Sequence, residues 1–229
     1  MDSNLGVKSV ISEAWKILKK DVKFFLILGL ILFAGQFLLQ LLANWLSDQG
    51  YSAMQLTFSL IQWGVQMYVG LIMLLVGIKA VRGESLTFDK ILVQDFETIK
   101  NYLFVSIVYG LIIFGGVLLL IVPGIIWGLT YGLATYLAAD KQLGVKEALS
   151  RSKQLTSGNR LKIAAIGLVL LVINILGAIP LGLGVIVTAP LSMLAGAVIY
   201  TRLADKNDSK PREQVAKPEI DNQQSQYQI

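Results

Sequence analysis

The chain has 229 residues, of which 55% are hydrophobic and 15% are charged, with 20 Lys and Arg against 15 Asp and Glu. A soluble domain of this length could not bury so much apolar surface, so the composition excludes that class and indicates an integral membrane protein. There is no Cys and no His, which removes disulfides, the commonest metal ligand and the usual proton-transfer group. We therefore expect no metal site and no cofactor.

The first unit of the chain is an amphipathic segment followed by two apolar runs. Over residues 7–22, apolar side chains recur at helical spacing and Lys and Glu occupy the complementary face. This helix is suited either to the headgroup layer of a membrane or to packing on the protein's own cytoplasmic surface. The apolar runs predict spans over residues 24–45 and 56–78, because about 20 apolar residues cross a hydrocarbon core of about 30 Å.

The second unit repeats this order. An amphipathic helix is predicted over residues 86–100, and the apolar run that follows, from residue 102 to 139, is too long for one crossing. Pro123 and Gly124 interrupt the run, and Pro removes a backbone donor while Gly admits turn conformations. We therefore expect two spans, over residues 102–122 and 125–139, with a tight turn at Pro123 and Gly124.

The third unit has an amphipathic helix over residues 144–156 and spans over residues 161–179 and 184–201, separated by a cluster of Gly and Pro. The predicted fold class is all-α: a polytopic membrane protein with six transmembrane helices in three hairpins, each hairpin preceded by a cytoplasmic amphipathic helix. Residues 1–203 are expected to form one membrane domain. The polar residues 204–229 are expected to form a disordered cytoplasmic tail.

The basic residues support this count of spans. All 20 Lys and Arg fall before the first span, between the second and third, between the fourth and fifth, or after the sixth. In a six-span topology these segments share one side, which the positive-inside rule makes cytoplasmic. We therefore expect a multi-pass protein of the bacterial inner (plasma) membrane with both termini in the cytoplasm.

Polar side chains form a stripe on each of the first two spans. Because consecutive spans are antiparallel, the stripes would meet at matching depths. Two interpretations are open, namely amide hydrogen bonds that join the two helices and a polar cavity open to the outer face. The residues of this candidate polar seam are Gln36, Gln40, Asn44, Ser59, Gln62 and Gln66.

Small residues mark candidate helix-packing faces. The fourth span has two overlapping G-x-x-x-G steps and the sixth has one small-x-x-x-small step, and such residues allow helix backbones to approach closely. Their partner is either another span of the same chain or another subunit. Asn174 is expected to make a hydrogen bond between helices. The residues of the packing faces are Gly124, Gly128, Gly132, Ser192 and Gly196.

The charged segments between the spans suggest contacts with anionic lipids, since a basic residue near anionic headgroups contributes about 1 kcal/mol. The alternative is that these charges act only as the topology signal. Nucleic-acid binding is not expected, because the charge is distributed between spans. No ionisable residue lies within a span, which argues against ion-coupled transport. The candidate lipid contacts are Lys146, Arg151, Lys153 and Arg160.

The stretch from Leu118 to Lys162 contains a Leu-rich run into Pro123 and Gly124, then Asp140, and then the sequences LGVKEA at 143–148 and TSGNR at 156–160. On these residues it resembles the membrane domain of glycerophosphoryl diester phosphodiesterases and related bacterial six-span integral membrane proteins. For those phosphodiesterases, the resemblance places the chemistry in a separate soluble domain that uses His and acidic residues with a metal, and this chain is expected to lack that domain.

We therefore expect a non-enzymatic membrane protein that organises or binds lipids or scaffolds a partner. Its expected partners are the bilayer, with its anionic lipids, and a membrane or cytoplasmic protein. The alternative is a passive or partner-driven transporter for a lipidic or neutral solute. A motif for nucleotide binding is absent from the sequence, so any energy for transport would have to come from a partner.

Overall fold

The computed structural model describes residues 5–48, 52–87, 91–179 and 184–208, and its regular elements in these ranges are helices. Six helical segments are long and apolar enough to cross a membrane: 22–48, 56–82, 96–119, 121–141, 160–178 and 185–205. The predictions of an all-α chain and of six span-capable helices are therefore confirmed for the described residues. Residues 49–51, between the first two of these segments, lie outside the described ranges.

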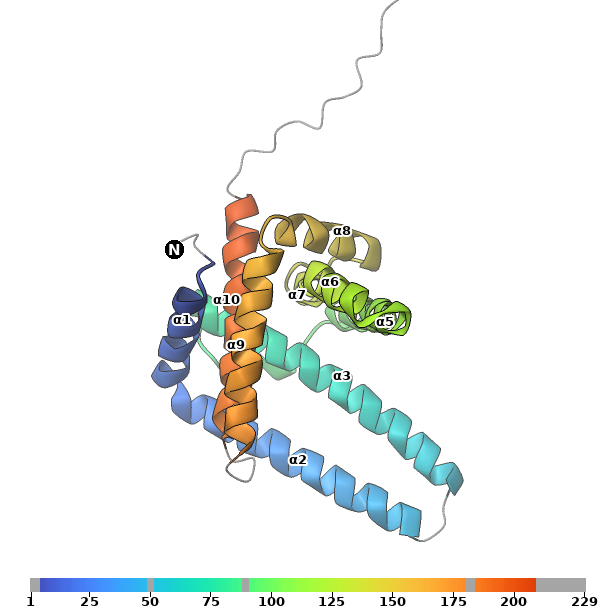
Figure 1. Cartoon of the computed structure of the whole chain (residues 1–229). Coiled ribbons are helices and arrows are strands. Elements are labelled where there is room, and N and C mark those ends of the chain that lie inside the picture. The colour runs from blue at the N-terminus through green and yellow to red at the C-terminus, as the bar shows by residue number, and fades with distance from the viewer. Residues whose placement is uncertain (1–4, 49–51, 88–90, 180–183, 209–229) are drawn as a thin grey trace, which may run out of the picture.

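The chain begins with α1 (Val7–Lys20), α2 (Val22–Asp48) and α3 (Ser52–Arg82). The apolar stripe of α1, with Val10, Ala14 and Leu18, is buried against the rest of the protein, where α1 lies beside α10 (Val185–Asp208) (Figure 1). The other face of α1 exposes its lysines. Helices α2 and α3 run antiparallel and extend away from the remaining helices (Figure 1).

The second predicted amphipathic helix, over residues 86–100, is not a single helix. Helix α5 (Phe96–Leu119) begins after Asp95, whose backbone is extended, so residues 96–100 form the first turns of α5. The Asp95 carboxylate accepts a hydrogen bond from Gln142 (2.8 Å), which has a left-handed backbone and ends α7 (Ala134–Lys141). This contact fixes a new helix start at Asp95, and residues 88–90 of the predicted helix lie outside the described ranges.

The predicted turn at Pro123 and Gly124 is wrong by three residues. The extended residue is Leu120, and α6 (Ile121–Tyr131) already contains Pro123 and Gly124. Pro is tolerated in a first turn because its missing N–H would have no helical partner there. Gly124 is needed for close packing, since a Cβ on it would lie 2.7 Å from Val117 Cγ2 on α5.

The chain continues through α8 (Val145–Thr156) and α9 (Arg160–Ala178) to α10. The break between α9 and α10 falls where it was predicted, and there a Cβ on Gly184 would lie 2.7 Å from Gly177 Cα. Pro180 and Gly182 of this predicted break lie outside the described residues. Helix α10 continues to Asp208, so the start of the predicted disordered tail at residue 204 is wrong by at least five residues.

The buried core lies in one part of the molecule, here called the inner part. It comprises α1, the start of α2, the end of α6, α7, α8 and the C-terminal parts of α3 and α10. Away from it, the helices expose large apolar side chains such as Leu38, Leu56, Leu118 and Leu176. The α2–α3 and α9–α10 pairs leave the inner part in different directions (Figure 1). Such exposed apolar surface fits a chain whose solvent is lipid hydrocarbon.

Candidate functional site

One carboxylate joins three parts of the chain within the inner part. Asp140, near the end of α7, accepts two hydrogen bonds from Arg82, with Nη1 2.6 Å from Oδ1 and Nη2 2.7 Å from Oδ2. Its Oδ2 also accepts a hydrogen bond from the Tyr200 hydroxyl at 2.7 Å. Arg82 ends α3 and Tyr200 lies on α10, so this triad links the first, second and third units of the chain. The Asp140 side chain is 8% exposed and that of Arg82 is 34% exposed.

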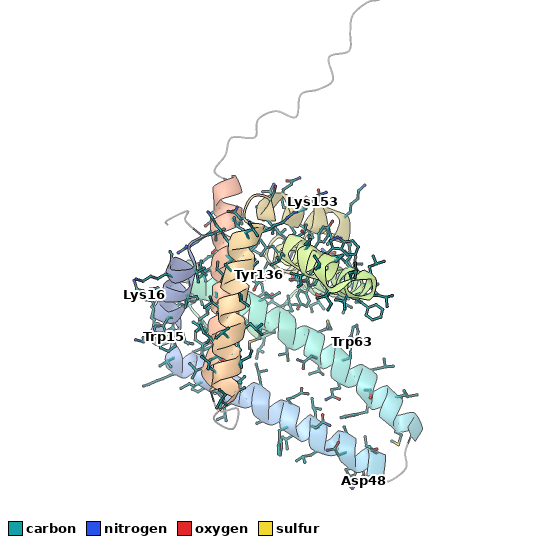
Figure 2. The ribbon with its side chains drawn as sticks, in the orientation of Figure 1. Trp15, Lys16, Asp48, Trp63, Tyr136 and Lys153 are labelled. Atoms are coloured by element: carbon teal, nitrogen blue, oxygen red, sulfur yellow. The ribbon has the colours of Figure 1, made fainter. Side chains whose placement is uncertain are left out.

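Aromatic packing holds Tyr200 in place for this contact. Its ring stacks on that of Tyr136, one turn before Asp140, with centroids 5.3 Å apart and planes 24° apart. Gly196 makes room for Tyr136, because a Cβ on residue 196 would overlap the Tyr136 hydroxyl. Tyr136 lies close to α10 in Figure 2. This predicted packing face therefore contacts another helix of the same chain.

The other predicted packing residues also have partners within the chain. Gly124 faces Val117 and Gly116 of α5, and Gly128 lies against Ile113 of the same helix. A Cβ on Gly132 would approach the Gly128 carbonyl of its own helix at 2.8 Å.

Asn174 makes a hydrogen bond between helices, as expected from the sequence. Its Nδ2 donates to Ser192 Oγ on α10 at 2.7 Å and to its own helix at the Leu170 carbonyl, at 2.8 Å. This bond joins the C-terminal half of α9 to α10, and it gives the packing residue Ser192 a partner within the chain.

Buried hydroxyl groups fix α8 to the end of α6. Ser152 Oγ donates to the Thr130 carbonyl at 2.9 Å, and Thr156 Oγ1 lies 3.1 Å from the same carbonyl oxygen and 2.9 Å from the Ser152 carbonyl of its own helix. All three residues are buried. Helix α6 ends at Tyr131, so the carbonyl of Thr130 is among those that the helix itself leaves unsatisfied. The contact therefore holds the inner face of α8 and determines which face it exposes.

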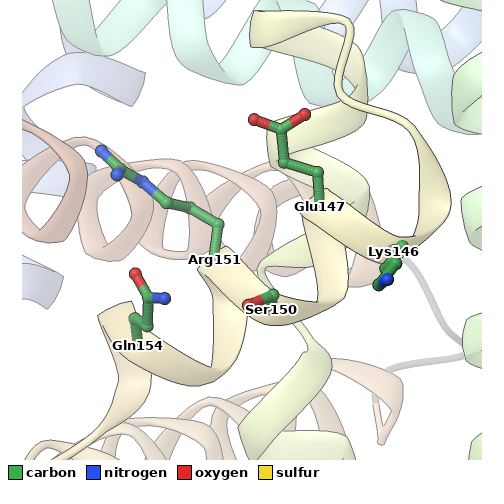
Figure 3. A pocket seen from close by; sticks show the side chains of 5 residues that line it. All are labelled: Lys146, Glu147, Ser150, Arg151 and Gln154. Carbon is green, nitrogen blue, oxygen red and sulfur yellow. The ribbon is translucent and has the colours of Figure 1, made fainter. Parts of the chain in front are cut away.

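The exposed face of α8 is polar and slightly hollow. A depression of about 440 Å³ is lined by five side chains of this one helix (Figure 3). Lys146 and Arg151 bring positive charge, Glu147 brings one negative charge, and Ser150 and Gln154 add a hydroxyl and an amide. Four of the five side chains can therefore donate hydrogen bonds to an anion in the depression.

The four candidate lipid contacts do not lie together. Lys146 and Arg151 line the depression, and Lys153 is exposed on the same helix. Figure 2 shows Lys153 far from Asp48, the last residue of α2. Arg160 begins α9, is partly buried, and has its Nε buried without a hydrogen-bond partner. We therefore treat the exposed face of α8 as the candidate site and leave Arg160 outside it.

No family model, curated protein or solved structure matches this chain. The resemblance to the membrane domain of the phosphodiesterases therefore stays a prediction. Within the described ranges, no group of three or more acidic, His or Cys side chains is placed to hold a metal ion.

The candidate polar seam lies on the exposed part of the α2–α3 pair. Gln36, Gln40, Asn44, Ser59 and Gln66 are exposed, and Gln62 is partly buried. Gln40 Nε2 donates to Asn44 Oδ1 within α2 at 3.2 Å. Among the described residues, Gln36, Gln62 and Gln66 make no hydrogen bond through their side chains. Both interpretations of the seam therefore remain predictions.

Sequence reasoning missed the Asp140 triad. It counted Arg82 only as a charge that sets topology, and Asp140 only as one of the residues that carry the resemblance. A second ion pair was missed in the same way: Arg202 on α10 contacts Glu13 on α1 and donates to Ser9 Oγ at 3.0 Å. The available signal was that acidic and basic residues sit at comparable depths, near the ends of different spans.

Proposed function

We propose that the protein is a non-enzymatic membrane protein that binds and organises anionic lipids at the cytoplasmic face of a bacterial inner membrane. In this proposal the six helices cross as three hairpins, both termini are cytoplasmic, and α1 and α8 lie at the membrane surface. The single observation that carries the proposal is the exposed face of α8. It presents the exposed Lys146 and Lys153 and the partly buried Arg151 on a helix whose opposite face is fixed to Thr130.

The chemistry of this face suits a lipid phosphate. Lys and Arg donate charge-assisted hydrogen bonds to phosphate oxygens, and the hydroxyl of Ser150 and the amide of Gln154 add neutral donors. Three basic residues at about 1 kcal/mol each supply about 3 kcal/mol, or roughly a 100-fold preference for anionic over zwitterionic headgroups. Glu147 opposes this attraction, and the exposed apolar side chains elsewhere are suited to the acyl chains.

The test is native mass spectrometry on protein extracted gently from its own membrane, together with lipid titration in nanodiscs. We expect an anionic lipid bound at fixed stoichiometry, with its affinity lowered about 100-fold when Lys146, Arg151 and Lys153 are all changed to Gln. The matched control changes three exposed lysines of α1, Lys8, Lys16 and Lys20, and should leave this lipid bound.

Other outcomes would contradict the proposal in distinct ways. An unchanged lipid affinity in the α8 variant would mean that its charge acts only in topology, and equal losses in the two triple variants would mean that the attraction is not specific to α8. A protein that co-purifies at fixed stoichiometry while no lipid is retained would move the function to a scaffold.

The exposed amides of the α2–α3 pair favour a second candidate, a passive or partner-driven transporter for a lipidic or neutral solute. Gln36, Gln40, Gln62 and Gln66 would supply uncharged hydrogen-bonding groups along a path through the membrane. In proteoliposomes, Gln40→Leu combined with Gln62→Leu should then change solute or lipid flux while the amount of folded protein stays the same. Flux equal to that of empty liposomes would exclude this function.

A further inference from the structure

Small and polar residues of the α2–α3 pair repeat with the spacing of a coiled coil. On α2, the residues Gln36, Gln40, Ala43 and Ser47 are separated by four, three and four positions. On α3, the same separations relate Gln55, Ser59, Gln62 and Gln66. This alternation is the heptad pattern that directs one face of each helix toward the axis of a helical bundle. Each helix of the pair therefore has a row of small and polar residues, here called its bundle seam, that would face the core of such a helical bundle.

The two seams are also in register with each other. Helices α2 and α3 are antiparallel (Figure 1), and counting outward along both helices from residues 49–51 places Gln40 at the depth of Gln62. The same counting places Gln36 at the depth of Gln66. Each of these two depths therefore carries two amides, one from each helix.

The single chain does not complete the bundle that this pattern specifies. Gln36, Gln40 and Gln66 are exposed, and a Cβ added to Gly29, Gly35 or Gly64 of the pair would meet no atom within 4 Å. The large apolar side chains of both helices over the same depths are exposed as well. Gln40 donates to Asn44 Oδ1 of its own helix, whereas the side chains of Gln36 and Gln66 make no hydrogen bond within the described residues. In hydrocarbon, amides without partners are strongly unfavourable, so these two side chains require a further polar surface at the same depth.

We propose that the α2–α3 pair binds the α2–α3 pair of a second copy of this chain, forming a four-helix bundle with an amide-lined core. A two-fold axis along the membrane normal keeps every residue at its own depth. Gln40 of one copy then meets Gln62 of the other, and Gln36 meets Gln66. Each amide has both a donor and an acceptor, so the seam is complementary to itself.

A second copy fits this surface better than a different partner. The seam carries no charge, so nothing in it calls for an oppositely charged protein. Gln36 and Gln40 of one copy need polar partners at their own depths in the membrane, and a second copy supplies Gln66 and Gln62 at those depths. The pair also extends away from the other helices (Figure 1), so a second pair can approach it without displacing the inner part.

The absence of Cys from the chain allows a direct test by cross-linking in native membranes. Two full-length chains with different tags, one with Gln40→Cys and one with Gln62→Cys, are co-expressed and oxidised, so that any disulfide between the tags joins two copies. The control uses Leu42→Cys and Leu60→Cys, which share a depth on the opposite faces of the helices and are exposed. We expect a cross-linked dimer from the first combination and little from the second.

Leucine substitutions provide an independent measurement. Changing Gln40 and Gln62 to Leu in all chains should raise the dissociation constant of the dimer about tenfold, measured by energy transfer between labelled copies in liposomes. The Leu42→Gln variant, on the other face, should not weaken the dimer.

Three results would overturn the proposal. The first is cross-linking of Gln40→Cys to Gln62→Cys only when both are placed in one chain, which would mean that the seam closes within the pair. The second is cross-linking to a different protein at the seam positions. The third is an equal yield of dimer from seam and control positions, which would indicate random collision.

Discussion

Removing the Asp140 carboxylate should destabilise the inner part. The carboxylate accepts three hydrogen bonds, two from Arg82 and one from Tyr200, and bonds to charged groups contribute about 1.5 to 3 kcal/mol each. These contributions are not additive. Arg82 is 34% exposed, so water can solvate its guanidinium once the carboxylate is gone. We therefore expect Asp140→Ala to lower the free energy of unfolding by about 3 kcal/mol.

Two milder variants separate the charge from the shape. Asp140→Asn keeps the volume and one acceptor, so it should cost about half as much, near 1.5 kcal/mol. Tyr200→Phe removes one hydrogen bond and keeps the stacking on Tyr136, so it should cost about 1 kcal/mol. The control is Asp205→Asn, because this carboxylate lies on the same helix as Tyr200 and is exposed. It should change stability by less than about 0.5 kcal/mol.

The assay is reversible unfolding in bicelles by steric trapping, which reads the free energy directly. A double-mutant cycle with Arg82→Gln and Asp140→Asn should give a coupling energy of about 2 kcal/mol, since the two side chains contact each other directly. A coupling energy near zero, or equal losses for Asp140→Ala and Asp205→Asn, would refute the view that this triad holds the three units together.

Two further predictions concern the packing around this triad. Gly196→Ala should destabilise the protein by about 1 to 2 kcal/mol because its Cβ overlaps the Tyr136 hydroxyl, and adding Tyr136→Phe should restore most of the lost stability. Thermal unfolding in detergent measures both effects. The control is Gly167→Ala, because a Cβ at this position meets no atom within 4 Å. Thr156→Val should raise hydrogen exchange along α8 by about 5-fold, because one of its two hydroxyl anchors is lost, whereas Ser150→Ala on the exposed face should not.

Much of the helical framework could be predicted because it depends on local properties of the sequence. Apolar runs of membrane-spanning length predicted six helices. The break between α9 and α10 was predicted from the cluster of Gly and Pro there, which includes Gly177 and Gly184. The turn at Leu120 was missed because Pro is equally compatible with a turn and with the first turn of a helix. There the close approach of Gly116 and Gly124 decides where the chain reverses.

The contacts of the inner part could not be predicted from local properties. Arg82, Asp140 and Tyr200 are separated by 58 and 60 residues, and each is an ordinary residue at the end of a span. Pairing them requires the relative rotation of three helix pairs, which hydrophobic runs do not specify. The helix predicted over residues 86–100 failed for a related reason, since the contact of Asp95 with Gln142 depends on a distant segment.

Polar contacts between helices are concentrated in the inner part, whereas amides of the α2–α3 pair lie outside it. In hydrocarbon, apolar side chains gain nothing from burial against each other rather than against lipid, so polar contacts and close packing must hold the helices together. The inner part has such contacts at Asp140, Thr130 and Arg202, and it can therefore hold the exposed face of α8 in a fixed position. The portion of the α2–α3 pair that lies away from the inner part carries the amides of Gln36 and Gln66, whose side chains make no hydrogen bond within the described residues. A second copy at the seam would supply the missing contacts there, and would place two α8 faces in one assembly, so that anionic lipids bind to both copies of a single dimer.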